Sequence, residues 1–232
     1  MDDLTRLRKE YARRERDGDN EKYGLTNVAH QFAVQRRQLD LVQLLTQCGI
    51  LPLDDKQILE IGCGSGAVFS ELLQLGAHSK HLYGIDLLPD RLPRSLIRHP
   101  DIGVSCADGR LTPFADRSFD VVVQFTVFSS ILDLSIQQQM AQEMCRLLRP
   151  TGVIVWYDFW LNPVNRHTMG IRPNLIRSLF PDCEITLKRV TLAPPIARRL
   201  VPLSKSVAAM LERVRLLNTH YLAVIRPKSI SV

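Results

Sequence analysis

The middle of the chain alternates short apolar segments with stretches whose apolar residues recur at helical spacing. The apolar segments, which we expect to be strands, are residues 58–61, 81–86, 102–107, 119–127 and 152–159. Helices are expected between them, at residues 66–76, 89–98 and 135–148. Strands that are apolar on both faces and separated by helices are typical of a parallel sheet covered on both sides. Right-handed crossovers between such strands give a doubly wound α/β fold.

The two flanks of this region carry further elements. Residues 3–16 are expected to form a charged, exposed helix, and a second helix is expected from Thr26, as its N-cap, to about Gln47. Its expected apolar face consists of Val28, Phe32, Leu39, Val42 and Leu45. After residue 159 we expect a helix at 173–180, a strand at 183–192, an amphipathic helix at 196–217 and a last strand at 219–226. The last two strands are expected to form an antiparallel pair.

Composition is that of an ordinary globular protein, whereas the charge is unevenly distributed. The 232 residues are 45% hydrophobic and 23% charged, which suits one α/β domain and excludes a disordered or fibrous chain. The net charge is +6, and residues 184–232 carry nine Lys and Arg against two Glu. This basic segment suits an anionic substrate, a nucleic acid or a membrane surface, or it is a solvated helix face.

The first residues and the cysteines bear on the location of the protein. No apolar run approaches the roughly 20 residues that span a bilayer, and the charged residues 1–19 lack the apolar part of a signal peptide. The cysteines show no CxxC spacing; they are Cys48, Cys63, Cys106, Cys145 and Cys183. We therefore expect reduced thiols in a cytoplasmic protein and no metal site.

The strongest local motif is ILEIGCGSGAV at residues 58–68, in which an expected strand runs into Gly62, Gly64 and Gly66 and a helix follows. Glycines at such a bend permit positive φ and let a ligand approach the backbone and the free N–H groups of the helix. Two interpretations are open. Gly62-x-Gly64-x-x-Ala67 matches the dinucleotide fingerprint, whereas starting from Glu60 gives an acid two residues before a GxGxG loop.

Two more acids follow later strands. Asp86 closes the second expected strand, 20 residues after Gly66, where an acid suits the paired hydroxyls of a ribose. This position favours a bound nucleoside without choosing between the two interpretations. Asp108 follows the third expected strand, and an acid there can accept a hydrogen bond from the exocyclic amine of an adenine.

Taken together, the motifs resemble a known family. EIGCGSG, GID, ADGxxxPFxDxSFD and LLRPxG have the order and spacing of class I S-adenosylmethionine-dependent methyltransferases. The resemblance covers about residues 55–160 and is nearest to the small-molecule methyltransferase-domain type, which includes ubiquinone and menaquinone methylases. It implies a Rossmann-like sheet of seven strands whose last strand is antiparallel, in a domain of residues 51–232. It also implies that the helices of residues 1–50 form a lid.

The resemblance further implies S-adenosylmethionine as the cofactor and a role for each motif. The implied contacts are Gly62, Cys63, Gly64 and Gly66 around the methionine part, Glu60 at its ammonium group, Asp86 and Leu87 at the ribose, Asp108 and Gly109 at the adenine amine, and Gln124 beside the cofactor. In the lid, we expect Tyr11 and Tyr23 to cover the sulfonium and Arg36 to lie near the carboxylate.

The acceptor is expected at the carboxyl ends of the strands, where ligands of open α/β sheets lie. Asp133, Asp158 and His167 follow the fourth and fifth expected strands and are candidate bases for an acceptor that must lose a proton. Asp158 is the first choice because it ends a strand among aromatic residues. These neighbours are Trp156, Tyr157, Phe159 and Trp160.

The expected function is transfer of a methyl group from S-adenosylmethionine to a small carbocyclic, sugar or lipid-like acceptor. The alternatives are an RNA methyltransferase, an NAD-dependent oxidoreductase and a catalytically silent binding module. Nucleic acid is not the expected partner, because the chain shows no RNA-binding module and has QFTVFSS where many base N-methylases have N/D-P-P-Y. The basic segment 184–228 is a candidate for peripheral contact with anionic lipid.

Overall fold

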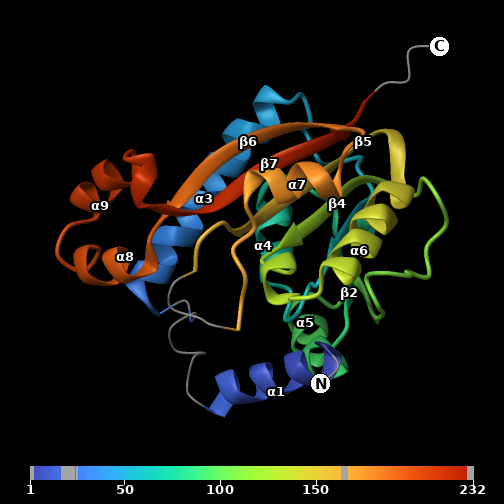
Figure 1. Ribbon diagram of the computed structural model, residues 1–232, viewed down its shortest axis with the longest axis horizontal. Coiled ribbons are helices and arrows are strands. Elements are labelled where there is room, and N and C mark those ends of the chain that lie inside the picture. Colours follow the sequence, from blue (N-terminus) through green and yellow to red (C-terminus); the bar gives the residue numbers. More distant parts are fainter. Residues whose placement is uncertain (1–2, 17–23, 25, 163–166, 229–232) are drawn as a thin grey trace.

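The computed structural model describes residues 3–16, 24, 26–162 and 167–228 (Figure 1). Its seven-stranded sheet has the order β3-β2-β1-β4-β5-β7-β6. The strands are β1 (Ile58–Ile61), β2 (Leu82–Asp86), β3 (Gly103–Cys106), β4 (Phe119–Phe125), β5 (Leu148–Phe159), β6 (Cys183–Leu192) and β7 (Asn218–Pro227). β7 is antiparallel to β5 and β6, and the other neighbouring strands are parallel. The doubly wound sheet with an antiparallel last strand is therefore confirmed.

Helices cover both faces of this sheet. One face packs against α3 (Val28–Gln47), α4 (Ala67–Gln74) and α5 (Leu92–Arg98), and the other against α6 (Leu134–Leu147) and α7 (Pro173–Leu179). In Figure 1, α1 (Asp3–Arg16) lies apart from the sheet, and α8 (Pro194–Leu200) and α9 (Lys205–Glu212) stand together beyond one end of it. Short 3-10 turns are η1 (Ser79–His81), η2 (Pro89–Arg91), η3 (Phe128–Ser130) and η4 (Arg215–Leu217). None of the described helices is long and apolar enough to cross a bilayer.

Each face of the sheet buries its own apolar cluster, because side chains alternate along a strand. In β5, Val155 and Tyr157 pack with α3 and α4, whereas Ile154 and Trp156 pack with α6 and α7. Burying one large apolar side chain stabilises the fold by about 1.5–3 kcal/mol. Burial on both faces explains why the central strands β1, β4 and β5 are mostly apolar.

The carboxyl ends of the parallel strands meet at one edge of the sheet. Ile61 at the end of β1 pairs with Ile85 and with Gln124, and Gln124 pairs in turn with Trp156. Because β7 is antiparallel, the beginning of this strand lies at the same edge, where His220 pairs with Phe159 of β5. The loops after β1, β2, β4 and β5 and the segment between β6 and β7 are therefore neighbours.

Helix α3 differs from the expectation in its cap and in its buried face. The N-cap is Asn27 rather than Thr26, because the Asn27 side chain accepts hydrogen bonds from the backbone N–H groups of Ala29 and His30. Leu39, expected on the apolar face, is 60% exposed. The residues that α3 does bury are Ala29, Phe32, Leu41, Leu44 and Leu45.

The single helix expected at residues 196–217 is wrong. It consists of α8, α9 and the turn η4, with a break at residues 201–204. Pro202 lies in this break and has no N–H group to continue a helix. Ser204 then starts α9 as its N-cap, accepting a hydrogen bond from the backbone N–H of Val207 at 3.3 Å.

Candidate cofactor and acceptor site

The glycine loop follows β1 and bends sharply into α4. Gly62, Gly64 and Gly66 have φ angles of 74°, 52° and 75°, a region that residues with a Cβ atom rarely adopt. The loop is fixed to the end of β2, because the Gly62 and Cys63 N–H groups donate to the Ile85 carbonyl at 2.8 and 2.9 Å. The expected strand–glycine–helix bend is therefore present, with Gly66 as the N-cap of α4.

Two side chains pack directly on this loop. A Cβ atom on Gly62 would overlap Cγ2 of Val127, a branched side chain that has few alternative rotamers. A Cβ atom on Gly64 would overlap Nη2 of Arg91, which is the movable end of a long side chain. A ligand that approaches the backbone at Gly64 must therefore share or take over the space of the Arg91 guanidinium.

Asp86 ends β2 with its carboxylate directed at the glycine loop. Its Oδ2 accepts a hydrogen bond from the Gly64 N–H at 2.8 Å, and its Oδ1 accepts one from the Leu88 N–H at 2.9 Å. Arg91 approaches the same carboxylate, with Nη1 at 3.5 Å from Oδ2. Leu87 lies between Asp86 and Leu88 in this turn. Asp86 is thus held in one orientation beside the loop, as a residue that recognises a ligand must be.

Glu60 lies on β1, two residues before the loop, and is only 2% exposed. Its Oε2 has no hydrogen-bond partner among the described residues. Burial, with the negative charges of Glu71 and Asp86 nearby, raises the pKa of the Glu60 carboxyl to about 8. A cation beside a buried, unpartnered carboxyl stabilises its ionised form. Glu60 is therefore suited to bind an ammonium group.

Gln124 lies at the end of β4 beside Ile61. Its side chain is fully buried, and its Oε1 accepts a hydrogen bond from the Val127 N–H at 3.1 Å. Its Nε2 has no partner among the described residues. The carboxyl edge of β1 and β4 therefore holds an unpaired carboxylate oxygen and an unpaired amide donor, both buried.

Asp108 and Gly109 follow β3. Asp108 forms an ion pair with Arg110, with Oδ2 at 2.6 Å from Nη2, and this pairing lowers the pKa of its carboxyl. Gly109 is buried, and a Cβ atom there would lie 2.9 Å from the end of Met140. An adenine amine at Asp108 would therefore compete with Arg110 for the carboxylate.

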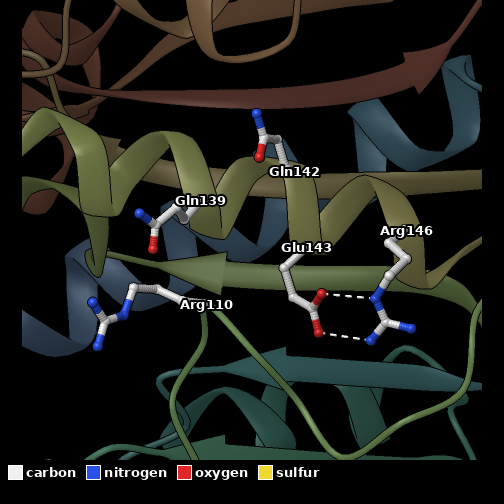
Figure 2. A pocket seen from close by; sticks show the side chains of 5 residues that line it. All are labelled: Arg110, Gln139, Gln142, Glu143 and Arg146. Carbon is white, nitrogen blue, oxygen red and sulfur yellow. Dashed lines mark hydrogen bonds and ion pairs between the residues drawn. The ribbon is translucent and has the colours of Figure 1, made fainter.

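A hollow of about 360 Å³ lies between this loop and α6 (Figure 2). Its lining residues are Arg110, Gln139, Gln142, Glu143 and Arg146. Figure 2 shows Glu143 paired with Arg146 through two contacts, and Glu143 also accepts hydrogen bonds from the N–H and hydroxyl of Thr112. No residue expected to bind the cofactor lines the hollow, and its ionic side chains fix the loop to α6.

On the acceptor side, Asp158 ends β5 and is 1% exposed. Its Oδ2 accepts a hydrogen bond from the Ser129 N–H at 3.0 Å, and its Oδ1 accepts one from the Phe159 N–H at 2.8 Å. Burial raises the pKa of this carboxyl to about 6, although the hydrogen bonds lower it. A carboxyl with this pKa is mostly ionised at neutral pH and can accept a proton.

The other two candidate bases have different surroundings. Asp133 is exposed and is the N-cap of α6, where its side chain accepts hydrogen bonds from the N–H and hydroxyl of Ser135, both at 2.8 Å. The side chain of His167 is 54% exposed, with Nε2 at 3.8 Å from a carboxylate oxygen of Glu10. Burial and a raised pKa therefore single out Asp158.

Helix α1 reaches the acceptor side of the site. The Arg6 guanidinium donates hydrogen bonds to the carbonyls of Ser130 and His167, and Glu10 on the same helix pairs with His167. Ser130 follows Ser129, whose N–H holds Asp158. Helix α3, which also belongs to residues 1–50, packs on the sheet instead, and the lid stays a prediction. Tyr23 and the side chain of Tyr11, which were expected to cover the sulfonium, lie outside the described residues.

The prediction for Arg36 differs from the structure. Arg36 was expected near the cofactor carboxylate, but its Nε donates to Glu212 of α9 at 2.5 Å. Arg37 instead points into the molecule, where it pairs with Glu71 and lies over the rings of Phe125 and Tyr157. Helical phase could have revealed this, because Arg37 precedes Leu41 and Leu44 by four and seven residues on the buried stripe of α3.

Trp156 and Tyr157 near the end of β5 are buried on opposite faces of the sheet. Trp156 is fully buried and packs on Phe128 and Phe180, so it belongs to the core. Tyr157 stacks on His220 with ring centroids 4.6 Å apart. Burial and the charge of Arg37 lower the pKa of His220 to about 3, so this imidazole is neutral.

Cys63 lies within the glycine loop. Burial raises the pKa of the Cys63 thiol well above its usual range, which keeps it protonated and unreactive. Among the described residues, no group of three or more His, Cys, Asp or Glu side chains is placed to hold a metal ion.

The residues at the carboxyl edge fit an adenosyl sulfonium with an amino acid end. The unpaired Glu60 oxygen complements an ammonium group, the fixed Asp86 carboxylate complements vicinal hydroxyls, and positive φ lets the loop backbone come close. The buried Gln124 amide supplies one more unsatisfied donor.

Comparisons with known proteins bear on the family and the fold. Residues 59–156 match the family described as "Methyltransferase domain". The demethylmenaquinone methyltransferase of Corynebacterium urealyticum is 28% identical over 150 residues, which are 62% of this chain and 57% of that protein. The match therefore spans a little over half of the length of that curated relative.

Solved structures share the fold at low sequence identity. A SAM-dependent methyltransferase from Archaeoglobus fulgidus has a TM-score of 0.58 at 15% identity, over 82% of this chain and 94% of that one. A TehB-like SAM-dependent methyltransferase from Corynebacterium glutamicum has a TM-score of 0.54 at 16% identity, over 95% and 97%. Residues 59–156 therefore match a methyltransferase domain, and the Rossmann-like sheet that contains them is shared with these S-adenosylmethionine-dependent methyltransferase structures.

Proposed function

We propose that the protein transfers a methyl group from S-adenosylmethionine to a small carbocyclic, sugar or lipid-like acceptor, with Asp158 as the general base. The observation that carries this proposal is a buried carboxyl with a pKa of about 6 at the carboxyl end of β5. It lies at the same edge of the sheet as the glycine loop, where ligands of such sheets bind.

S-adenosylmethionine, when bound, supplies a methyl group that the sulfonium has already activated. The protein must then align the acceptor and exclude water, and Glu60, Asp86 and Gln124 hold the donor for that purpose. Asp158 takes the proton from an acceptor hydroxyl or carbon acid, and the backbone N–H groups of Ser129 and Phe159 fix its orientation.

Helix α1 supports a small acceptor rather than a polymer. Arg6 and Glu10 attach it to Ser130 and His167, so it covers the side of the site that carries Asp158. A covered site excludes water from the reaction and admits a compact molecule more readily than an RNA duplex. The name of the curated relative, a demethylmenaquinone methyltransferase, supports a carbocyclic acceptor.

The test is a transfer assay with S-adenosylmethionine labelled in the methyl group. The acceptors are demethylmenaquinone in reduced form, a lipid extract and total RNA. We expect label in the organic-solvent extract, and Asp158→Asn should slow its appearance by about 10²–10⁴-fold without weakening the binding of S-adenosylhomocysteine. Label only in RNA, or undiminished transfer by Asp158→Asn, would overturn the proposal.

A further inference from the structure

The segment between β6 and β7 forms a separate surface, which we call the α8–α9 surface and define as residues 194–217. Its inner side is apolar and packed: Ala197, Val201 and Ala208 are buried against Phe32 of α3 and Leu192 at the end of β6. This packing fixes α8 and α9 to the body of the protein. In Figure 1 the two helices project beyond the end of the sheet, next to α3.

The outer side of this surface is apolar as well. Leu203, Met210 and Leu216 are 83%, 62% and 80% exposed. Val207 and Val214 are also exposed. Val207 and Met210 lie three residues apart on α9, whereas Leu203 precedes this helix and Val214 and Leu216 follow it. Single exposed apolar residues are common, but five within residues 203–216 are typical of a contact surface.

The exposed charged residues of the α8–α9 surface are all basic. They are Arg198, Arg199, Lys205, Arg213 and Arg215. The acid in this segment, Glu212, is buried and pairs with Arg36 of α3. Within the described part of the chain, no carboxylate lies at ion-pair distance from any of the five basic side chains.

The α8–α9 surface follows β6 and precedes β7 at the end of the sheet where the candidate site lies. It joins the end of β6 to the beginning of β7, and β7 begins next to the end of β5, where His220 pairs with Phe159. A partner held by the α8–α9 surface would therefore be close to the carboxyl edge that carries Asp158.

We propose that the α8–α9 surface docks on a lipid bilayer that contains anionic phospholipid. Apolar side chains on one helix face enter the boundary between headgroups and acyl chains, while Lys and Arg around them meet anionic headgroups. Nucleic acid is a poorer partner, because Leu, Met and Val offer no ring on which a base stacks. This inference goes beyond the proposed function and does not depend on which acceptor is methylated.

The test is co-sedimentation of the full-length protein with two kinds of vesicle. One is phosphatidylcholine alone, and in the other about a third of the lipid is phosphatidylglycerol. We expect pelleting with the anionic vesicles, weakened by added salt because salt screens the headgroup charge. Lys205→Gln with Arg213→Gln should lower the partition coefficient roughly thirtyfold, at about 1 kcal/mol per basic residue.

Matched variants separate the apolar contribution and serve as controls. Leu203→Ser with Leu216→Ser should also lose most of the pelleting. Ile97→Ser with Arg177→Gln changes one exposed apolar and one exposed basic residue elsewhere and should pellet like wild type. Unchanged thermal unfolding of each variant shows that the fold is intact, because all of these side chains are at the surface.

Three outcomes would overturn the proposal. The first is wild-type protein that stays in the supernatant with anionic vesicles. The second is pelleting that neither pair of α8–α9 substitutions reduces. The third is self-association, or binding to an RNA homopolymer, that these substitutions abolish while vesicles are not bound, which would assign the surface to a second copy of the chain or to nucleic acid.

Discussion

The guanidinium of Arg37 pairs with the carboxylate of Glu71 and thereby joins α3 to α4 next to the glycine loop. Arg37 also lies 5.1 Å from the ring centre of Phe125 and 4.9 Å from that of Tyr157. This buried cation is close enough to Glu60 to oppose the rise of its pKa. The pair is therefore both a structural link and part of the electrostatic environment of the site.

Removing one member of this pair should cost much more than removing both. Arg37→Ala leaves Glu71 buried without its cation, so we expect the free energy of unfolding to fall by about 3–5 kcal/mol. Arg37→Met combined with Glu71→Leu should lose clearly less. Denaturant unfolding measures both, and Lys56→Ala, which breaks an exposed pair with Asp55, is the control that should leave the midpoint unchanged. Equal losses in the single and double variants would contradict this role.

Replacing Gly62 by alanine should lower the free energy of unfolding more than the same change at Gly49, which has a similar φ and no neighbouring side chain. Gly49 has φ of 67° and nothing within 4 Å of the place that a Cβ atom would occupy, so Gly49→Ala should cost about 1–2 kcal/mol for the backbone alone. Gly62→Ala adds overlap with Val127, which we expect to cost about 1–3 kcal/mol more. Denaturant unfolding of the two variants decides this, and equal losses would mean that Val127 simply moves aside.

Cofactor binding should release a proton from Glu60. With a pKa of about 8, this carboxyl is mostly protonated at pH 7 in the free protein, and a bound ammonium group lowers that pKa. Calorimetric titration with S-adenosylhomocysteine in buffers of different ionisation enthalpy should therefore show release of nearly one proton at pH 7. Glu60→Gln should show almost none. The same proton count in both proteins would place the ammonium group elsewhere.

Methyl transfer should depend on ionised Asp158. Its pKa of about 6 predicts a rate that rises with pH through 6 and then levels, because a base must be unprotonated to act. Asp158→Asn should slow transfer by about 10²–10⁴-fold. In this variant the rise in rate with pH should disappear. His167→Gln is the control and should keep the wild-type profile. If the rate of Asp158→Asn still rises with pH as in wild type, the titrating group is another residue.

The raised pKa of Asp158 also makes the stability of the folded protein depend on pH. The folded-state pKa of Asp158 lies above the value of an unfolded Asp, so the native state binds the proton more tightly. Ionising this buried carboxyl therefore costs stability as the pH rises from about 4 to about 6.

Much of the fold follows from patterns that depend on few residues. Segments such as residues 119–127 and 152–159 are mostly apolar because both faces of the sheet are covered, so their strands were predictable. The glycine spacing and Asp86 identified the loop, since positive φ and a strand-end acid are local requirements. The contacts of α1, the pairing of Asp108 with Arg110 and the partners of each acid depend on side chains brought together by the fold.

The sequence-based predictions differ from the structure where a single residue determines where a helix ends or which way a side chain points. Pro202 and Ser204 divide the helix expected at 196–217, although its apolar spacing continues across the break. Arg36 and Arg37 are adjacent and chemically identical, and only the phase of the buried stripe directs Arg37 inward. Asp133 is typical of a helix N-cap, and in the fold this capping function accounts for it.

The most direct test of the central claim is calorimetric titration with S-adenosylmethionine, S-adenosylhomocysteine and NAD. The proteins compared are wild type, Asp86→Ala, Asp86→Asn and the exposed control Asp101→Ala. We predict that wild type and Asp101→Ala bind both adenosyl compounds and not NAD, and that both Asp86 variants bind them roughly tenfold or more weakly, since a hydrogen bond to a charged group contributes about 1.5–3 kcal/mol. Undiminished binding by the Asp86 variants, or binding of NAD in place of S-adenosylmethionine, would contradict the account.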